Sequence, residues 1–211
     1  MTLRVGSLCS GYGGLEIALR EVFDDIDLRW VSDNDPGAAK ILAYRFPEVQ
    51  NLGNIFEVNF AHVEAVDILT AGFPCTDVSG AGKKEGLAKH TRTGLWYEVA
   101  RAIRELNPPV VILENVLGLL SGRAHSDLEW CPGCMGDDPD GIVLRALGCV
   151  LGDLATLGYD AEWETVPASA AGAPHRRERV FVLATRSPDT QQQGLEVGEV
   201  QSHGQERAPA V

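Results

Sequence analysis

The expected fold is decided by residues 3–23, LRVGSLCSGYGGLEIALREVF. A short apolar run (3–9) meets a glycine-rich turn (10–14), and apolar residues then recur at helical spacing (15–23). This is the order strand, tight turn, helix, because glycine permits the sharp turn and the two periodicities differ. The chain therefore opens with the first half of a β-α-β unit.

The same alternation continues along the chain. Pro36 precedes a helical segment and suits its first turn. Further strands are expected at 28–33, 66–72, 110–116, 159–166 and 179–185, and further helices at 37–46, 95–106 and 143–158. The strands up to residue 116 are continuously apolar, which is typical of burial on both faces of a parallel sheet. We therefore expect an α/β fold with a mostly parallel sheet.

Length and composition favour one domain. The 211 residues are 45% hydrophobic, enough for a real core. No stretch approaches the roughly 20 apolar residues that span a bilayer, and a secretory h-region is missing from the start, so we expect an intracellular, cytoplasmic protein. Residues 1–185 form the expected domain, and residues 186–211, without an aromatic residue, are expected to be a disordered tail or the start of a truncated region.

The charge of the chain is unevenly distributed. Its net value of −12 argues against a polyanionic partner. Positive charge nevertheless gathers in two segments: residues 79–94 hold four basic residues against one Glu, and residues 175–179 hold three against one. Overall acidity therefore does not exclude a polyanionic partner, which would contact the first segment through Ser79, Lys83, Lys84 and Arg92.

The five cysteines are odd in number and irregularly spaced, which suits reduced thiols. Cys131 and Cys134 form a single CxxC pair. A tight turn closed by Pro-Gly is the favoured interpretation and zinc the weaker alternative, because a second pair is missing. We expect no metal site.

The glycine-rich turn suggests a ligand. Gly11, Gly13 and Gly14 let the backbone approach a ligand at a helix N-terminus. Asp33 ends the second strand, where a carboxylate holds the ribose of nucleotide cofactors. An ordinary strand-to-helix turn explains the glycines alone, but the pair of features favours a nucleotide-derived cofactor.

Three further elements carry chemistry. Cys75 follows a buried strand at the sheet edge where α/β proteins place their sites, and is either a nucleophile or a structural thiol. Glu114 ends the next strand and is either a proton or hydrogen-bond donor or a helix cap. Arg177 and Arg179 share one face of a predicted strand, which favours an anionic or polar-edged ligand over surface pairing.

Taken in order, these segments resemble the motif series of the DNA (cytosine-5) methyltransferases over roughly residues 3–185. The similar stretches are SLCSGYGGLE, SDNDP, DILTAGFPCTDVSGAGKKEGL, VVILENVLGLL and GAPHRRERVFVLAT. The resemblance implies a Rossmann-like methyltransferase sheet and S-adenosylmethionine as cofactor. It assigns the cofactor to Cys9, Gly11, Gly13, Gly14, Asp33, Asn34, Asn54, Ile55 and Pro74.

The resemblance also implies a mechanism. Cys75 would add to C6 of a flipped cytosine, Glu114 would hold its amine and protonate N3, and Arg177 and Arg179 would orient the ring carbonyl and a phosphate. Departures from the family pattern are few. They are Cys9 for a phenylalanine, Thr76 for a glutamine, Asn54 for an aspartate and His175 for a glutamine.

The family's target-recognition region and last cofactor motif are missing from the sequence. A second chain that supplies them, or a truncated product, would explain this. Three alternatives stay open: a non-catalytic methyltransferase-like binding protein, an RNA cytosine methyltransferase, and a nicotinamide oxidoreductase, which leaves the Pro-Cys and Glu-Asn-Val elements unexplained.

Overall fold

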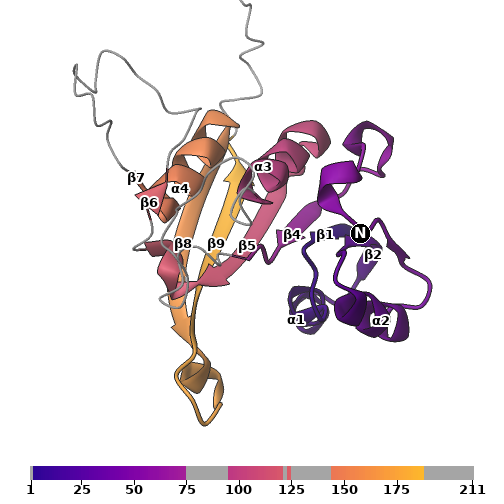
Figure 1. Ribbon diagram of the computed structural model, residues 1–211, viewed down its shortest axis with the longest axis horizontal. Coiled ribbons are helices and arrows are strands. Elements are labelled where there is room, and N and C mark those ends of the chain that lie inside the picture. The colour runs from indigo at the N-terminus through magenta and orange to yellow at the C-terminus, as the bar shows by residue number, and fades with distance from the viewer. Residues whose placement is uncertain (1, 75–94, 121–122, 125–143, 188–211) are drawn as a thin grey trace, which may run out of the picture.

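Strand β1 (Leu3–Leu8) lies inside a seven-stranded sheet with the order β3-β2-β1-β4-β5-β9-β8 (Figure 1). The computed structural model describes residues 2–74, 95–120, 123–124 and 144–187. The other strands of this sheet are β2 (Ile26–Ser32), β3 (Gln50–Asn51), β4 (Ile68–Ala71), β5 (Val110–Val116), β8 (Tyr159–Pro167) and β9 (Glu178–Arg186). All the expected strands are therefore present, and the short β3 is added to them.

The four helices of the described residues also occur where the sequence predicts them. They are α1 (Gly14–Val22), α2 (Pro36–Arg45), α3 (Leu95–Leu106) and α4 (Ala146–Thr156). The helix expected over 143–158 starts later, because Leu144–Arg145 (β7) pairs instead with Arg123–Ala124 (β6). Short 3₁₀ turns lie at η1 (Ile55–Glu57), η2 (Phe60–His62), η4 (Leu117–Leu120) and η5 (Ala168–Ala171).

The sheet is mostly parallel, as expected. Strand β1 pairs in parallel with β2 on one side and β4 on the other, and β5 continues in parallel beside β4. Strand β9 then runs antiparallel to β5, and β8 antiparallel to β9. After β1 the chain forms β2 and β3 on one side of it, and then returns to form β4 on its other side. The carboxyl ends of β1 and β4 therefore flank a topological switch point, where open α/β sheets bind ligands.

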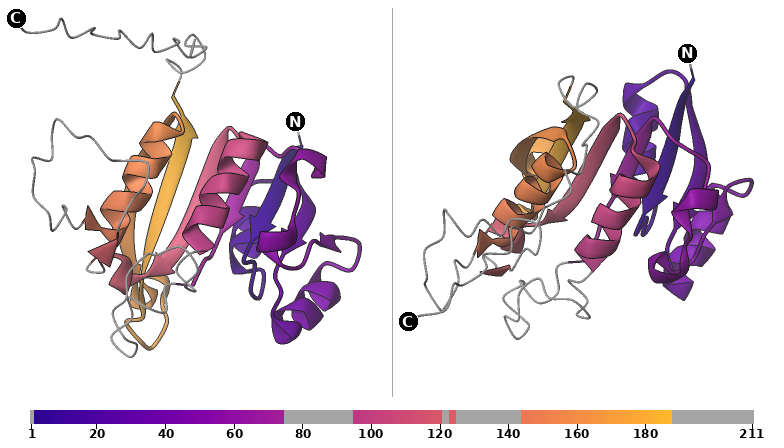
Figure 2. Two further views of the ribbon diagram at one scale, coloured as in Figure 1. Left: turned by 45° about the horizontal axis from the view of Figure 1, so that its top comes forward. Right: turned by 90° about the horizontal axis from the view of Figure 1, so that it is seen from above.

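Helices cover the sheet in two layers (Figure 2). Leu19 of α1 and Leu42 of α2 pack with Val5 and Ile68 on one face. Helices α3 and α4 pack on the opposite face, where Trp96, Ile103 and Leu154 are fully buried among residues of β4, β5 and β9. Alternate residues of each strand point to opposite faces, which is why neighbours such as Ile68 and Leu69 join different clusters.

Burial on both faces is found for only part of the sheet. All four residues of β4 are buried, but β5 alternates between buried and half-buried residues. On β9, Leu183 is 46% exposed. The prediction of two-sided burial is therefore wrong for β5. On the face that α1 and α2 cover over β1, β2 and β4, no described helix extends over β9.

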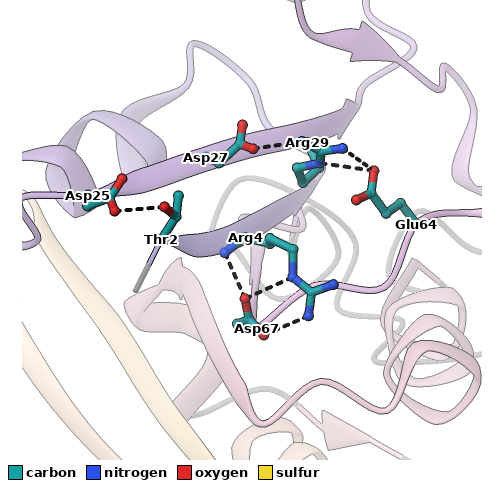
Figure 3. Close-up of polar contacts among 7 residues, drawn as sticks. All are labelled: Thr2, Arg4, Asp25, Asp27, Arg29, Glu64 and Asp67. Carbon is teal, nitrogen blue, oxygen red and sulfur yellow. Dashed lines mark hydrogen bonds and ion pairs between the residues drawn. The ribbon is translucent and has the colours of Figure 1, made fainter.

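Ion pairs join residues near the amino ends of β1, β2 and β4 (Figure 3). Arg4 donates to Asp67 through its backbone N–H and its guanidinium, at 2.8 to 3.0 Å. Arg29 bridges Asp27 and Glu64. These hydrogen bonds from Arg4 lower the pKa of Asp67, and they tether β1 to the residue just before β4.

Among the described residues, none of the helices has the length and apolar character required to cross a membrane.

Candidate active site

A cavity of about 830 Å³ opens at the carboxyl ends of β1, β2 and β4. Its volume falls within the range of small-molecule sites. The residues that line it are Cys9, Gly11, Ser32, Asp33, Asn34, Asp35, Pro36, Gly53, Asn54, Ile55, Phe56, Gly72, Pro74 and Leu95. The structure thus brings together all the predicted cofactor residues except Gly13 and Gly14.

Asp33 joins the segments that line this cavity through hydrogen bonds. Its Oδ2 accepts a hydrogen bond from the Gly11 backbone N–H at 2.8 Å, and its Oδ1 accepts one from the Asp35 N–H at 2.9 Å. Its own backbone N–H donates to the Asn51 side chain at 3.1 Å. A carboxylate offers about four lone-pair sites, so both oxygens retain capacity for ligand hydroxyl groups. Asp33 can therefore shape the loop and bind a ligand at the same time.

Cys9 has an uncommon environment. Its backbone adopts a positive φ of 50°, a left-handed conformation that only a few per cent of non-glycine residues adopt. Burial, and then the negative charge of Asp33, raise the pKa of the Cys9 thiol to about 12. The thiol is therefore protonated at neutral pH and lines the cavity as a small, weakly polar group.

The three glycines of the turn have different environments. Gly11 lines the cavity at φ 54°. Gly13 is the N-cap of α1 at φ 76°, and a Cβ there would lie 2.6 Å from Cε2 of Phe46. Gly14 begins α1, and a Cβ there would meet nothing within 4 Å. Gly13 is thus required by the packing of α1 near Phe46, and its predicted cofactor role, like that of Gly14, stays a prediction.

The η1 turn forms another wall. Asn54 is its N-cap: the side-chain oxygen accepts from the Phe56 N–H at 3.3 Å, and the side-chain nitrogen donates to Glu57 at 2.9 Å. Ile55 is buried, whereas Phe56 is 54% exposed and lines the cavity. The wall therefore offers aliphatic and aromatic surface to a flat ligand group.

The segment that leads to Cys75 is anchored from β5. Asn115 is 3% exposed, and its side-chain nitrogen donates to the Phe73 carbonyl at 2.9 Å. The Phe73 ring packs against Trp96 of α3, with ring centroids 5.4 Å apart. Pro74 is exposed at the cavity. These contacts fix the backbone up to the residue before Cys75, which itself lies outside the described residues, as do Ser79, Lys83, Lys84 and Arg92.

Glu114 and Arg179 form an ion pair at the same edge of the sheet. Nε of Arg179 lies 2.7 Å from Oε1 of Glu114, and the two side chains are 23% and 28% exposed. Antiparallel pairing places Val116 opposite Arg179, so both charged side chains lie on the α1 face of the sheet. A Cβ on Gly72 would lie 3.5 Å from Oε2 of Glu114, so the carboxylate lies next to a glycine that lines the cavity.

Arg177 is placed differently from the prediction. Strand β9 begins at Glu178, so Arg177 precedes the strand and is exposed. Its carbonyl accepts a hydrogen bond from the Ala168 N–H at 3.3 Å. The expectation that both arginines stand on one strand is therefore wrong, and the role of Arg177 as a site residue stays a prediction.

Sequence reasoning missed half of the cavity lining. Ser32, Asp35, Pro36, Gly53, Phe56 and Gly72 lie within two residues of predicted ones in the chain, and proximity could have suggested them. Leu95 gives no such signal, because it reads only as the first residue of a helix. Within the part of the chain that the structure describes, no cluster of three or more His, Cys, Asp or Glu residues could hold a metal ion.

Comparison with known proteins identifies the family. The model of the C-5 cytosine-specific DNA methylase family matches residues 3–208. The chain belongs to this family. Among curated relatives of this chain, type II methyltransferase M.NlaIV of Neisseria lactamica is 31% identical over 172 residues. Type II methyltransferase M2.BsuMI of Bacillus subtilis is 32% identical over 194 residues.

The chain covers less than half of each of these relatives. The matches span 82% of it but 38% of M.NlaIV, and 89% of it but 43% of M2.BsuMI. Solved structures share its α/β methyltransferase fold. Dnmt2 methyltransferase of S. pombe has a TM-score of 0.61 at 17% identity, over 88% of this chain and 50% of that one. A putative DNA modification methyltransferase from an E. coli prophage has the same TM-score at 23% identity, over 87% and 47%.

Proposed function

We propose that this chain carries the cofactor-binding and catalytic residues of a DNA cytosine-5 methyltransferase. The observation that carries the proposal is the placement of the Glu114–Arg179 ion pair beside a nucleotide-sized cavity, with Gly72 between them. Pro74, one residue before Cys75, lines the same cavity. A methyl donor in the cavity and a base held by Glu114 would thus be adjacent.

The cavity suits S-adenosylmethionine. Asp33 offers carboxylate oxygens for ribose hydroxyl groups, as in other nucleotide sites at a switch point. Ile55, Phe56 and Leu95 supply apolar surface for an adenine ring. Gly11 leaves the backbone open to close approach, since a Cβ added at this position would meet nothing within 4 Å. When bound, the cofactor supplies an electrophilic methyl group.

The residues of the chain would activate the base, because C5 of cytosine is too weak a nucleophile to react alone. The Cys75 thiolate forms a bond to C6, while Glu114 holds the exocyclic amine and delivers a proton to N3. The electron pair gained by the ring then makes C5 nucleophilic toward the methyl group. Water or hydroxide then takes the C5 proton, the S–C6 bond breaks to return the thiolate, and N3 gives its proton back to Glu114. Arg179 orients Glu114 through the 2.7 Å contact.

The substrate proposed is double-stranded DNA from which the cytosine is flipped, because C5 and C6 are inaccessible inside a stacked duplex. The relatives named above are type II methyltransferases of roughly twice the matched length. We include in the proposal a second chain that supplies target recognition and the last cofactor motif. Its test is whether candidate partner chains increase methylation by this chain.

A trapping experiment tests the catalytic proposal. The chain is mixed with S-adenosylmethionine and DNA containing 5-fluorocytosine. Because fluorine replaces the C5 proton whose loss would release the enzyme, the covalent intermediate cannot break down. We expect a covalent protein–DNA adduct, detected by denaturing gel and mapped to Cys75 by mass spectrometry. Cys75→Ala should form none. Equal trapping by Cys75→Ala would show that the nucleophile is wrong.

A parent chain that forms no adduct and binds no cofactor, with or without candidate partner chains, would refute the catalytic proposal and favour the alternative, a non-catalytic methyltransferase-like binding protein.

A further inference from the structure

Arg101 is a cation of α3 that no step above uses. Its guanidinium donates to the Ile55 carbonyl through Nη2 at 3.0 Å and to the Val58 carbonyl through Nη1 at 3.1 Å. These carbonyls lie in and just after the η1 turn, more than 40 residues away in sequence. A planar guanidinium with fixed N–H directions is suited to hold two carbonyls in one geometry.

The guanidinium is itself fixed from three sides. Nε donates to Glu98 at 2.7 Å, one turn earlier on α3, and Glu105 lies 3.5 Å from Nη1. The Arg101 side chain also stacks over the Phe60 ring, with Cζ 5.0 Å from the centroid, and that ring is 2% exposed. With a side-chain exposure of 27%, Arg101 is shielded enough for these contacts to exceed the strength of surface pairs.

The two elements joined by Arg101 form two walls of the cavity. Ile55 and Phe56 line it from η1, and Leu95 lines it from the first turn of α3. The distance between these walls depends on how η1 sits against α3. Arg101 donates hydrogen bonds from α3 to the carbonyl of Ile55 in η1 and to that of Val58, the residue after it.

We propose that Arg101 is a positioning residue for the cofactor: it fixes η1 on α3 so that Ile55 and Leu95 enclose the base end of the ligand. The inference rests on the proposed function, because it takes the ligand to be S-adenosylmethionine. It predicts that loss of the guanidinium lowers affinity for the adenosine part and leaves the contribution of the amino-acid part unchanged.

The test measures binding by calorimetry to adenosine and to S-adenosylhomocysteine, with melting curves of the ligand-free chains. We expect Arg101→Gln to weaken both ligands by the same factor, roughly tenfold, the size of one charge-assisted hydrogen bond. Arg101→Lys keeps the charge but loses the fork, so we expect roughly threefold. Arg104→Gln, at an exposed position on the same helix, is the matched control and should bind like the parent.

Equal affinity of the parent and a folded Arg101→Gln chain overturns the inference. So does a loss confined to S-adenosylhomocysteine, because it would place the effect at the amino-acid end. If Arg101→Gln does not fold, Arg101→Lys decides, and parent-like binding by that variant overturns the inference. A parent chain that binds neither ligand refutes the proposed function itself, and the inference falls with it.

Discussion

Replacing each glycine of the 10–14 turn by alanine should separate backbone conformation, packing and ligand contact. Gly11 and Gly13 both adopt positive φ, at 54° and 76°. A Cβ meets nothing within 4 Å at Gly11 but lies 2.6 Å from the Phe46 ring at Gly13. Gly14 is clear of neighbours, and its φ is not left-handed. The same added methyl group therefore meets three different environments.

The expected magnitudes follow from these environments. A left-handed alanine costs about 1–2 kcal/mol, which applies to Gly11→Ala and Gly13→Ala alike. Contact with the Phe46 ring, which is 4% exposed and has little room to move, adds about 1–3 kcal/mol for Gly13→Ala. The total of about 2–5 kcal/mol is a large part of a typical domain's stability. Gly14→Ala should stay within about 0.5 kcal/mol of the parent.

Urea denaturation followed by circular dichroism measures the stability, and S-adenosylhomocysteine binding measures the ligand contact. Gly13→Ala should be the least stable variant. Gly11→Ala should lose less stability but more affinity, because Gly11 lines the cavity and Gly13 does not. If Gly11→Ala and Gly13→Ala are equally stable, the packing argument at Phe46 is refuted. If Gly14→Ala matches Gly13→Ala, the conformational argument fails as well.

Two further predictions concern buried groups. Glu16 is 1% exposed; its Oε1 accepts from the Thr70 hydroxyl at 2.7 Å, and its Oε2 has no partner among the described residues. Thr70→Val should therefore lower the free energy of unfolding by about 2–3 kcal/mol, whereas Thr70→Ser should retain most of it, and equal stability of the two in urea would contradict this account. Because burial and Asp33 raise the pKa of Cys9 to about 12, only about one Cys9 thiol in 10⁴ is ionised at pH 8. At pH 8, iodoacetamide should label Cys9 only after the chain is unfolded, as read by peptide mass mapping. In the native chain, labelling should begin only as the pH nears 12. Labelling of native Cys9 at the rate of a free thiol at pH 8 would count against the buried environment.

The sequence predicts elements well where local signals are strong. Helix α3 and strand β5 occur at the predicted bounds, 95–106 and 110–116, because an amphipathic segment ends at two prolines and a continuous apolar run follows. Pro36 stands in the first turn of α2, as expected. The predicted start of α4 is wrong because residues 144–145 pair with a strand that lies 20 residues or more away in sequence. Local periodicity contains no information about such a partner.

The site was predictable in composition but not in arrangement. The sequence predicts Asp33 and Asn54 as ligand-binding residues. They line the cavity, but both also hold turns together by accepting hydrogen bonds from backbone N–H groups. Glu114 and Arg179 are predicted from separate motifs, and their ion pair depends on the antiparallel register of β9, which no motif specifies. Arg101 carried no signal, since an arginine among helical polar residues is ordinary on a surface.

The register between β5 and β9 has a consequence for folding. Glu114 and Arg179 are 179 − 114 = 65 residues apart, and they meet only when β9 has returned antiparallel to β5 with Arg179 opposite Val116. Because side chains alternate along a strand, a slip of one residue would send the guanidinium to the α3 face and expose a different row of β9. Closing so long a loop is slow relative to local helix formation. The ion pair therefore forms only once β9 has paired with β5, and its formation brings together two residues of the proposed catalytic site.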